Sequence, residues 1–506
     1  SFVDDTMIDV RELTIAKAHD AFRDGSLTAT SLCAAYLDRI ERLDKAGLRL
    51  NSTMALSKTA LQEATALDAL YHATGKFKGT LHGIPILVKD QADTEGMVTT
   101  YGSAVAKNNI ASQDAFVVTK LKEAGAVIVG KTTCAEWAAT WFSANGATDY
   151  EFTKNPYNLE HDVGASSGGS GAAVAANFAM LAVGEDTGGS IRVPSSFCNL
   201  VGIRVTPGLI SRTGFCPLVK DQDTPGPMAR TVTGCAIMLD AMVGYDPADE
   251  YTYVAATAKS LGNPRGGSYA AQLDQGLDKL KGAKLGVLRQ LFGPDSDEHC
   301  HAVNLVMHDV LNTFKEAGTH LIDAHIDNLD NAFTSCELYT IRSRSDINSF
   351  LATKPHLPQD LAEIVPKTPA KPFLDLASSM AHGPSNPLDH PAYASRLLAR
   401  DELKRKVGCL FAEYELDALI TPDVQVPPPL CSDAYSGRFE NTSFPTNTFL
   451  ASLTGFPAVS VPGGWTEDGL PVGLELVGLG FHEQHLLELA RGVEILRSAR
   501  RAPPGL

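Results

Sequence analysis

The chain has 506 residues, of which 44% are hydrophobic and 20% are charged. This composition is typical of a soluble globular protein with a large core, and the length fits two or three average domains or one large α/β domain. The formal net charge of −16 argues against a nucleic-acid partner that is held through its phosphates.

Nine cysteines lie far apart, and no two of them have C-x-x-C spacing. An odd count without that spacing favours reduced, mostly buried thiols over disulfides or a zinc site. No apolar stretch reaches the roughly 18 residues that span a membrane. We expect a cytoplasmic protein, with secretion as an alternative because the sequence begins with Ser1 rather than Met.

The N-terminal region, at about residues 8–75, predicts a helical layer. Gly25 is expected to end the first helix, and Thr28 or Thr30 to cap the second. Apolar residues recur at helical spacing in three segments: 13–23, 32–43 and 56–73.

From Gly83 onward, helices alternate with short apolar strands, the first of which ends at Lys89. The predicted strands are 84–88, 126–129, 180–183, 201–205, 285–288, 418–420, 458–461 and 472–477. The predicted helices are 117–124, 172–177, 231–243, 298–317 and 482–496. This alternation favours an α/β fold with a sheet that is buried on both faces.

Two segments interrupt the alternation. Residues 245–280 are loop-rich, and residues 354–391 are rich in proline and polar residues. The second segment is our candidate for a variable excursion that faces a ligand. Neither segment is a clear linker, so the sequence gives no reason to divide the chain into independent domains.

Two serine-bearing, glycine-rich turns lie between residues 163 and 192, and the second reads Asp186-Thr-Gly-Gly-Ser190. A hydrolase that acts on an unactivated carbonyl needs an attacking hydroxyl, a proton acceptor and backbone N–H groups that face the new oxyanion. Paired glycines allow the backbone to expose its N–H groups beside Ser190. The segment is therefore a candidate catalytic centre.

Two other motifs admit different interpretations. Residues 125–132 fit the nucleotide-binding pattern G-x-x-x-x-G-K-[ST], but the residues between the glycines are themselves a predicted strand rather than a phosphate-binding loop. Residues 164–168 fit the G-x-S-x-G turn of a histidine-based serine esterase, which should follow a strand. Residues 159–162 instead predict a polar loop, yet 14 histidines leave this alternative open.

Lys89 is unusual because it ends a run of five apolar residues. Its ammonium could reach water along the apolar surface or pair with Asp90. Burial would instead lower its pKa until a neutral amine can accept a proton. The sequence alone leaves both interpretations open.

Together these motifs resemble the amidase signature family, whose members include fatty acid amide hydrolase, peptide amidases and the glutaminase subunit of the tRNA-dependent amidotransferase. The resemblance covers nearly the whole chain and is carried by residues 83–90, 130–132, 166–170, 186–194, 226–231, 453–457 and 469–473. It implies one large domain over residues 1–506, with a central mixed sheet covered by helices on both faces. A variable substrate-facing region is expected at about residues 290–450.

The resemblance also implies a Ser–cisSer–Lys triad. Ser190 matches the family's nucleophile, and Ser166 matches a bridging serine that follows a cis peptide bond. Lys89 matches the base, and Lys131 is expected to be structural. No cofactor or metal is required for this chemistry.

Further site residues follow from the same resemblance. The oxyanion donors map to the backbone N–H groups of Thr187, Gly188, Gly189 and Ser190. Ser167 matches a hydroxyl that supports the lysine. Asp186 and Arg192 match a pair that holds the nucleophile turn, and an ordinary structural salt bridge is equally compatible with them. Three aromatic residues are predicted either to line the substrate pocket or to pack in the core: Trp137, Trp141 and Phe142.

The sequence thus predicts an amidohydrolase that cleaves carboxamide C–N bonds outside the peptide backbone through an acyl-enzyme on Ser190, with anilides, esters and carbamates as further substrates. The alternatives are a glutaminase subunit of a tRNA-dependent amidotransferase and a histidine-based serine esterase. The expected partners are a small-molecule substrate and, as an option, a second copy of the chain.

Overall fold

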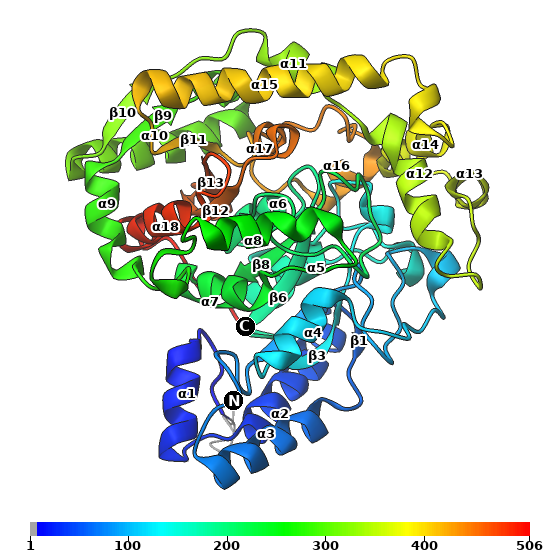
Figure 1. The fold of residues 1–506 in the computed structure, drawn as a ribbon, viewed down its shortest axis with the longest axis vertical. Helices are drawn as coiled ribbons and strands as arrows, with labels where there is room; N and C mark the ends of the chain where they lie inside the picture. Colours follow the sequence, from blue (N-terminus) through cyan, green and yellow to red (C-terminus); the bar gives the residue numbers. More distant parts are fainter. Residues whose placement is uncertain (1–7) are drawn as a thin grey trace.

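The computed structural model describes residues 8–506, which form a single domain around one mixed sheet of eleven strands (Figure 1). The strand order is β1-β3-β2-β6-β8-β7-β12-β13-β11-β9-β10. The strands of this sheet are β1 (Thr53–Leu56), β2 (Pro85–Lys89), β3 (Val127–Thr132), β6 (Leu181–Asp186), β7 (Val201–Arg204), β8 (Thr224–Ala229), β9 (Lys284–Val287), β10 (His320–Asp323), β11 (Ala418–Pro422), β12 (Ala458–Trp465) and β13 (Pro471–Val477).

The direction of the strands places the carboxyl ends of β2 and β6 on the same side of the sheet. Strand β2 runs parallel to both β3 and β6, whereas β6 pairs with β8 in antiparallel fashion. On the far side of the sheet, β9 is parallel to β10 and β11. Because β2 and β6 are parallel neighbours, their carboxyl ends lie side by side.

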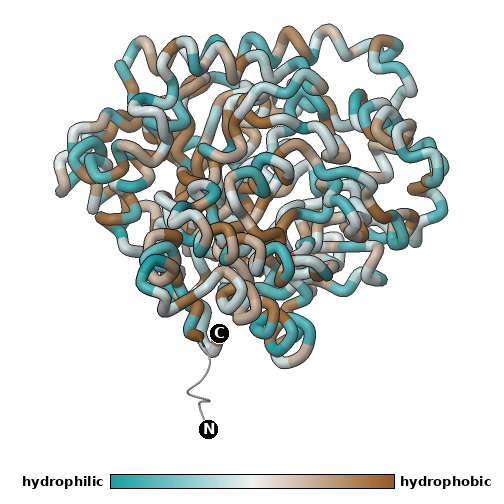
Figure 2. Tube along the Cα trace, turned by 60° about the horizontal axis from the view of Figure 1, so that its bottom comes forward, coloured by the Kyte–Doolittle hydropathy of each residue, from teal (hydrophilic) through white to brown (hydrophobic). Residues whose placement is uncertain are grey.

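Helices flank the sheet, as the sequence predicts. In Figure 2 the hydrophobic segments concentrate in the interior, and hydrophilic segments are scattered over the outline. The helices are α1 (Ile15–Asp24), α2 (Ala29–Arg39), α3 (Ala60–Thr74), α4 (Phe116–Glu123), α5 (Gly168–Ala175), α6 (Arg192–Phe197), α7 (Val232–Met242), α8 (Tyr253–Ser260), α9 (Gly276–Gly282), α10 (Glu298–Ala317), α11 (Leu329–Ser335), α12 (Tyr339–Leu351), α13 (Leu361–Ile364), α14 (Asp375–Ala381), α15 (Tyr393–Tyr414), α16 (Cys431–Ser436), α17 (Phe449–Thr454) and α18 (Glu483–Arg497).

The N-terminal region contains the three predicted helices and one strand that was not predicted. Gly25 ends α1 with a φ of 80°, and the Thr28 side chain caps α2 by accepting from the Ser31 N–H. The third predicted helix begins later than expected, because β1 occupies residues 53–56 and pairs with β3. Tertiary pairing therefore overrides the alanine-rich helical pattern at this point.

Two other sequence interpretations need correction. Residues 245–280 are not only loops, because they include helices α8 and α9. Residues 159–162 are not a polar loop, because they belong to β5 (Asn158–Asp162), which pairs with β4 (Lys154–Asn155) in a separate two-stranded sheet. Four of the five residues of β5 are polar and its first four residues are exposed or half-buried, which suits a strand at the surface.

The nucleotide-binding pattern does not form a loop. Its Gly130-Lys131-Thr132 end lies inside β3, and Lys131 is fully buried. The Lys131 ammonium lies 3.7 Å from an Asp90 carboxylate oxygen and donates to the hydroxyl of Thr99 at 3.0 Å. These contacts fit the structural role that is expected for Lys131.

Most of the cysteines are buried, as their number and spacing indicate. All nine cysteines are free, and seven of them are buried. Within residues 8–506, none of the helices is both long and apolar enough to cross a bilayer.

Candidate active site

The candidate site lies where the carboxyl ends of β2 and β6 meet. Lys89 is the last residue of β2, and Asp186 is the last residue of β6. The register of the two strands pairs Val88 with Val183, so Lys89 lies beside the end of β6. The Gly-rich turn that carries Ser190 follows directly.

Lys89 contacts Ser166 at the start of the neighbouring helix α5. The Lys89 amine nitrogen lies 2.7 Å from the Ser166 hydroxyl oxygen, and it also donates to the Glu185 carbonyl oxygen at 3.3 Å. The peptide bond between Ala165 and Ser166 is cis. A neutral amine can accept the Ser166 hydrogen across this contact, which leaves the Ser166 oxygen able to accept another hydrogen.

Lys89 does not reach water, because its side chain is fully buried. Burial lowers the pKa of the Lys89 amine, and the nearby Glu185 carboxylate acts in the opposite direction. The nearest Glu185 carboxylate oxygen lies 3.7 Å from the amine nitrogen. The surface-reaching interpretation of Lys89 is therefore wrong, and its burial shifts the equilibrium towards the neutral amine.

Ser190 lies at the wall of a cavity. Its side chain is almost buried and lines this cavity, and its carbonyl oxygen accepts from the Ser167 N–H at 3.2 Å. Among residues 8–506, no hydrogen bond joins the Ser190 and Ser166 hydroxyls. Of the two links in the predicted proton path, the structure therefore contains the one between Lys89 and Ser166.

The turn from Thr187 to Ser190 leaves its backbone N–H groups free. None of these four groups donates to a protein acceptor in the described part of the chain. Gly189 has a φ of 146°, and a Cβ atom there would collide with the Thr448 side chain. A Cβ atom at Gly188 would collide with the Tyr339 hydroxyl. The space at positions 188 and 189 suits glycine, and the free N–H groups of the turn suit an oxyanion.

Asp186 anchors the turn through two arginines. Its carboxylate accepts two hydrogen bonds from Arg192, at 2.9 and 3.0 Å, and one from Arg204 at 3.0 Å. All three side chains are fully buried. Although burial alone would raise it, the pKa of Asp186 is lowered to about 2 by the adjacent guanidinium groups. These hydrogen bonds connect the end of β6, directly before the turn that carries Ser190, to the first residue of α6.

Ser167 supports the lysine through the backbone of Glu185. The Ser167 hydroxyl donates to the Glu185 carbonyl oxygen at 3.1 Å, and the Glu185 N–H lies 3.2 Å from the same hydroxyl. Lys89 donates to that carbonyl as well. Ser167 thereby fixes an acceptor that orients the amine.

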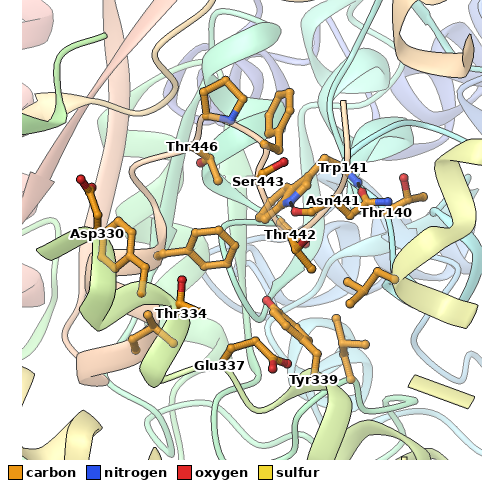
Figure 3. Close-up of a pocket in the computed structure, with 18 of the residues that line it drawn as sticks. Thr140, Trp141, Asp330, Thr334, Glu337, Tyr339, Asn441, Thr442, Ser443 and Thr446 are labelled. Atoms are coloured by element: carbon orange, nitrogen blue, oxygen red, sulfur yellow. Dashed lines mark hydrogen bonds between the residues drawn. The ribbon is translucent and has the colours of Figure 1, made fainter. Parts of the chain in front are cut away.

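The cavity beside Ser190 has a volume of about 650 Å³. Figure 3 shows its lining side chains converging from the start of α12, with Glu337 and Tyr339, and from the segment that contains Asn441 to Thr446. Its apolar lining residues are Ala138, Trp141, Leu218, Leu291, Phe333, Leu376, Phe444, Pro445, Phe449 and Leu453. A largely apolar cavity of this size fits a drug-sized molecule.

Of the three predicted aromatic residues, Trp141 lines this cavity. Its indole N–H donates to the Asn441 carbonyl oxygen at 2.9 Å, and its ring stacks on Phe444. Trp137 and Phe142 are buried nearby but are not among the cavity-lining residues. Trp137 stacks on Tyr101, which is a core contact.

Two buried carboxyls near Lys89 were not predicted from the sequence. Glu185 and Asp223 both contact the Thr187 hydroxyl, at 3.1 and 2.6 Å. Glu185 had a signal, since it is a charged residue that directly follows the apolar run at residues 180–184. Asp223 had no signal in the sequence, because only tertiary folding brings the loop before β8 to the turn at residues 187–190.

A histidine-based mechanism has no support in this geometry. No histidine is among the cavity-lining residues of the described chain, and Ser166 is fully buried and does not line the cavity. Residues 8–506 also contain no group of three or more potential metal ligands. The serine of the G-x-S-x-G pattern is therefore a partner of Lys89 rather than an exposed nucleophile.

The amidase family model matches residues 31–487. A glutamyl-tRNA(Gln) amidotransferase subunit from Ralstonia pickettii is 33% identical, over 92% of this chain and 94% of its own length. Native peptide amidase from Stenotrophomonas maltophilia superimposes with a TM-score of 0.82 at 31% identity, covering 97% of this chain and 98% of that one.

A second solved structure is the corresponding glutamyl-tRNA(Gln) amidotransferase subunit from Thermotoga maritima. It superimposes with a TM-score of 0.74 at 26% identity, covering 98% of this chain and 99% of that one. The names of the curated relatives agree better with the alternative of a glutaminase subunit than with the amidohydrolase first predicted.

Proposed function

The chain belongs to the amidase family, and we propose that it hydrolyses a carboxamide C–N bond through an acyl-enzyme on Ser190. One observation carries the proposal: the buried Lys89 amine lies 2.7 Å from the Ser166 hydroxyl, beside the turn that presents Ser190 to the cavity. A neutral amine and a bridging hydroxyl are what a serine needs in order to lose its proton as it attacks.

Acylation begins when the Ser190 hydroxyl oxygen attacks the amide carbon. Ser166 takes the Ser190 proton and passes its own proton to the Lys89 amine, which becomes an ammonium. The oxyanion is stabilised by the free N–H groups of residues 187–190. As the C–N bond breaks, the same path returns the proton to the leaving amine, so the triad ends in its starting state.

Deacylation repeats these steps with water. The water gives its proton to the triad as its oxygen attacks the ester carbon of the acyl-enzyme, and Ser190 regains a proton when it leaves. The rigid Asp186–Arg192 pair keeps the oxyanion donors in place throughout both half-reactions.

The first candidate substrate is an amide with an apolar or aromatic acyl group. The apolar lining and the volume of about 650 Å³ support this choice, because a small polar amide would leave much of that surface uncovered. The peptide amidase neighbour supports it as well. Anilides, esters and carbamates that share such an acyl group belong to the same proposal.

The second candidate is glutamine, with this chain as the glutaminase subunit of a tRNA-dependent amidotransferase. The names of the curated relatives favour it. Charged groups at the cavity also favour it, because Asp330 and the ion pair between Glu337 and Arg396 could meet the α-amine and the α-carboxylate. In this case the ammonia that is released would pass to a partner protein.

One experiment separates the two candidates. The purified chain and its Ser190→Ala variant are assayed against glutamine and against primary amides, anilides and carbamates of increasing acyl size. Ammonia or amine release is the readout. A kcat/KM that rises with apolar acyl size favours the first candidate, and preferred turnover of glutamine favours the second. Equal activity in the Ser190→Ala variant would refute the acyl-enzyme.

A further inference from the structure

Next to Lys89, two buried carboxyls meet at one hydroxyl. The Thr187 hydroxyl oxygen lies 2.6 Å from an Asp223 carboxyl oxygen and 3.1 Å from a Glu185 carboxyl oxygen. Thr187 has a single hydroxyl hydrogen, so it can donate to only one of them. The other contact is a hydrogen bond only if that carboxyl carries a proton.

The burial of the two carboxyls also indicates that one of them carries a proton. Glu185 and Asp223 are almost completely buried, and two carboxylates in such a place would repel each other strongly. Burial raises the pKa of Glu185, and burial together with the Glu185 carboxylate raises the pKa of Asp223. The pair is therefore most stable with one proton and one negative charge.

We propose that Glu185 and Asp223 share one proton through Thr187, and that this pair is a positioning element that sets the charge state of Lys89. The proposal rests on the proposed function, in which Lys89 is the base. Glu185 is the member of the pair that acts on the amine, because its second carboxyl oxygen lies 3.7 Å from the Lys89 nitrogen.

In the resting state the negative charge lies on Asp223. Its carboxylate accepts from the N–H groups of Leu218, at 2.9 Å, and Val219, at 3.1 Å, and from the Thr187 hydroxyl. Glu185 then carries the proton and donates it to the Thr187 oxygen. With a neutral carboxyl beside it, Lys89 stays neutral and can act as a base.

When Lys89 takes the proton from Ser166, the charge of the pair can follow. The Glu185 proton moves to the Thr187 oxygen as the Thr187 hydrogen moves to Asp223, so no proton is gained or lost. The negative charge is now on Glu185, next to the new ammonium. Such a shift stabilises the transition state more than the ground state, which is what lowers a barrier.

A second cavity reaches the same pair. It has a volume of about 240 Å³, is lined by Glu185 and Asp223 at its buried end, and includes the exposed residues Lys220 and Thr353. It shares no lining residue with the cavity at Ser190. The second oxygen of Glu185 is buried and has no hydrogen-bond partner within residues 8–506.

The other titratable groups around Lys89 do not replace this pair. Cys134 has a pKa raised by burial and is neutral. Asp186 is ionised but is held by Arg192 and Arg204. The groups that flank the second cavity are Lys220, Cys216, Asp346 and the ion pair of Arg212 with Asp249.

The test is the pH dependence of Ser190 labelling by a small fluorophosphonate, which does not depend on the natural substrate. In Glu185→Gln the whole negative charge sits on Asp223, which makes no ion pair with Lys89 in the described chain. We expect the midpoint of the rising limb to fall by about one pH unit. In Asp223→Asn the charge sits on Glu185, so the midpoint should rise.

If both carboxylates were ionised independently, each of the two substitutions would lower the midpoint. Shifts in opposite directions therefore identify a shared proton. Downward shifts in both variants, or no shift in Glu185→Gln, overturn the proposal. The matched control is Glu483→Gln, since Glu483 is equally buried, has one unpartnered oxygen and a pKa raised by burial, yet lies at α18 away from the site. Its midpoint should equal that of the wild type.

A second measurement covers the case in which Asp223→Asn does not fold. The infrared difference spectrum of wild type minus Glu185→Gln at neutral pH should contain the C=O band of a protonated carboxyl. Absence of that band means that Glu185 does not carry the proton in the resting state, which overturns the proposal. Failure of wild-type Ser190 to react with the probe would instead count against the proposed function, while the infrared result would still decide on the pair.

Discussion

Lys89 and Ser166 lie 77 positions apart in the sequence, yet their side chains are joined by a 2.7 Å hydrogen bond that water does not reach. The parallel neighbours β2 and β6 and the start of α5 bring them together. A buried amine that contacts a hydroxyl, rather than only a carboxylate, can exchange a proton with it. This contact is the basis for the predictions on catalysis.

Replacement of the two serines should separate the nucleophile from the bridge. Ser190→Ala should abolish turnover, because it removes the hydroxyl that forms the acyl-enzyme in the proposed mechanism. Ser166→Ala should lower kcat by a factor of about 10²–10⁴, which is the usual contribution of a general acid–base group. The measurements are steady-state kinetics and fluorophosphonate labelling. Full labelling of Ser190→Ala would contradict the assignment.

The kcat/KM of hydrolysis should rise with pH, because the Lys89 amine must be neutral to accept a proton. The pKa of Lys89 is lowered by burial from the ordinary 10.5, and only the neutral form above that pKa accepts a proton. We expect kcat/KM to climb through a midpoint below 10.5 and to be highest on the alkaline side of neutrality. Lys89→Ala should lose most activity, and Lys89→Arg should not restore it, because a guanidinium stays protonated. An optimum in acid would contradict Lys89 as the base.

Glycine at position 189 should be essential for activity. Gly189→Ala would place a methyl group against Thr448 in a backbone conformation with a φ of 146°, so the N–H donors would move. We expect kcat to fall by a factor of about 10² or more, as when an oxyanion donor is lost. Gly408→Ala is the control, because nothing lies within 4 Å of its added Cβ atom. Unchanged kcat in Gly189→Ala would argue against this turn as the oxyanion site.

Much of the sheet could be predicted from the sequence, because its buried strands are short apolar runs. Strand β2, with Lys89 at its end, and helix α10 at Glu298–Ala317 lie where the periodicity predicts them. Strand β1 could not be predicted, since Thr53–Leu56 is a strand only because it pairs with β3. Strand β8 contains two prolines and a glycine, so its sequence does not resemble a strand.

The site could be predicted only in part, and mostly through resemblance. The glycine- and serine-rich sequence of residues 166–190 by itself indicates a candidate catalytic centre. The lining of the cavity could not be predicted in this way. Trp141 and Tyr339 meet there from distant segments, and the local sequences of these segments share no pattern. The partnership of Glu185 with Asp223 likewise depends on the tertiary fold, and each residue alone is an ordinary carboxylate.

Trp141 should determine how well apolar acyl groups bind. Trp141→Ala removes a ring that lines the cavity and packs against Phe444 and Phe449. We expect KM for an aromatic amide to rise by about tenfold, since a lost aromatic contact costs about 1 kcal/mol beyond the area it buries. KM for a two-carbon acyl amide should change little. Equal effects on both substrates would indicate a general loss of structure instead.

Asp186 should make stability depend on pH in acid. Its pKa is about 2 in the folded protein and near 3.8 when unfolded, so its stabilising effect is complete above pH 3.8 and is lost as the pH falls towards 2. The shift corresponds to about 2 kcal/mol. Asp186→Asn should lower the free energy of unfolding by about 3–5 kcal/mol at neutral pH, because it leaves buried guanidinium groups unpaired. That deficit should narrow below pH 4 in denaturant titrations. The exposed pair of Asp401 with Arg405 provides the control, and Asp401→Asn should cost less than about 1 kcal/mol. A deficit for Asp186→Asn that stays constant between pH 7 and pH 2 would show that the Asp186 carboxylate is not held in its ionised form by the arginines.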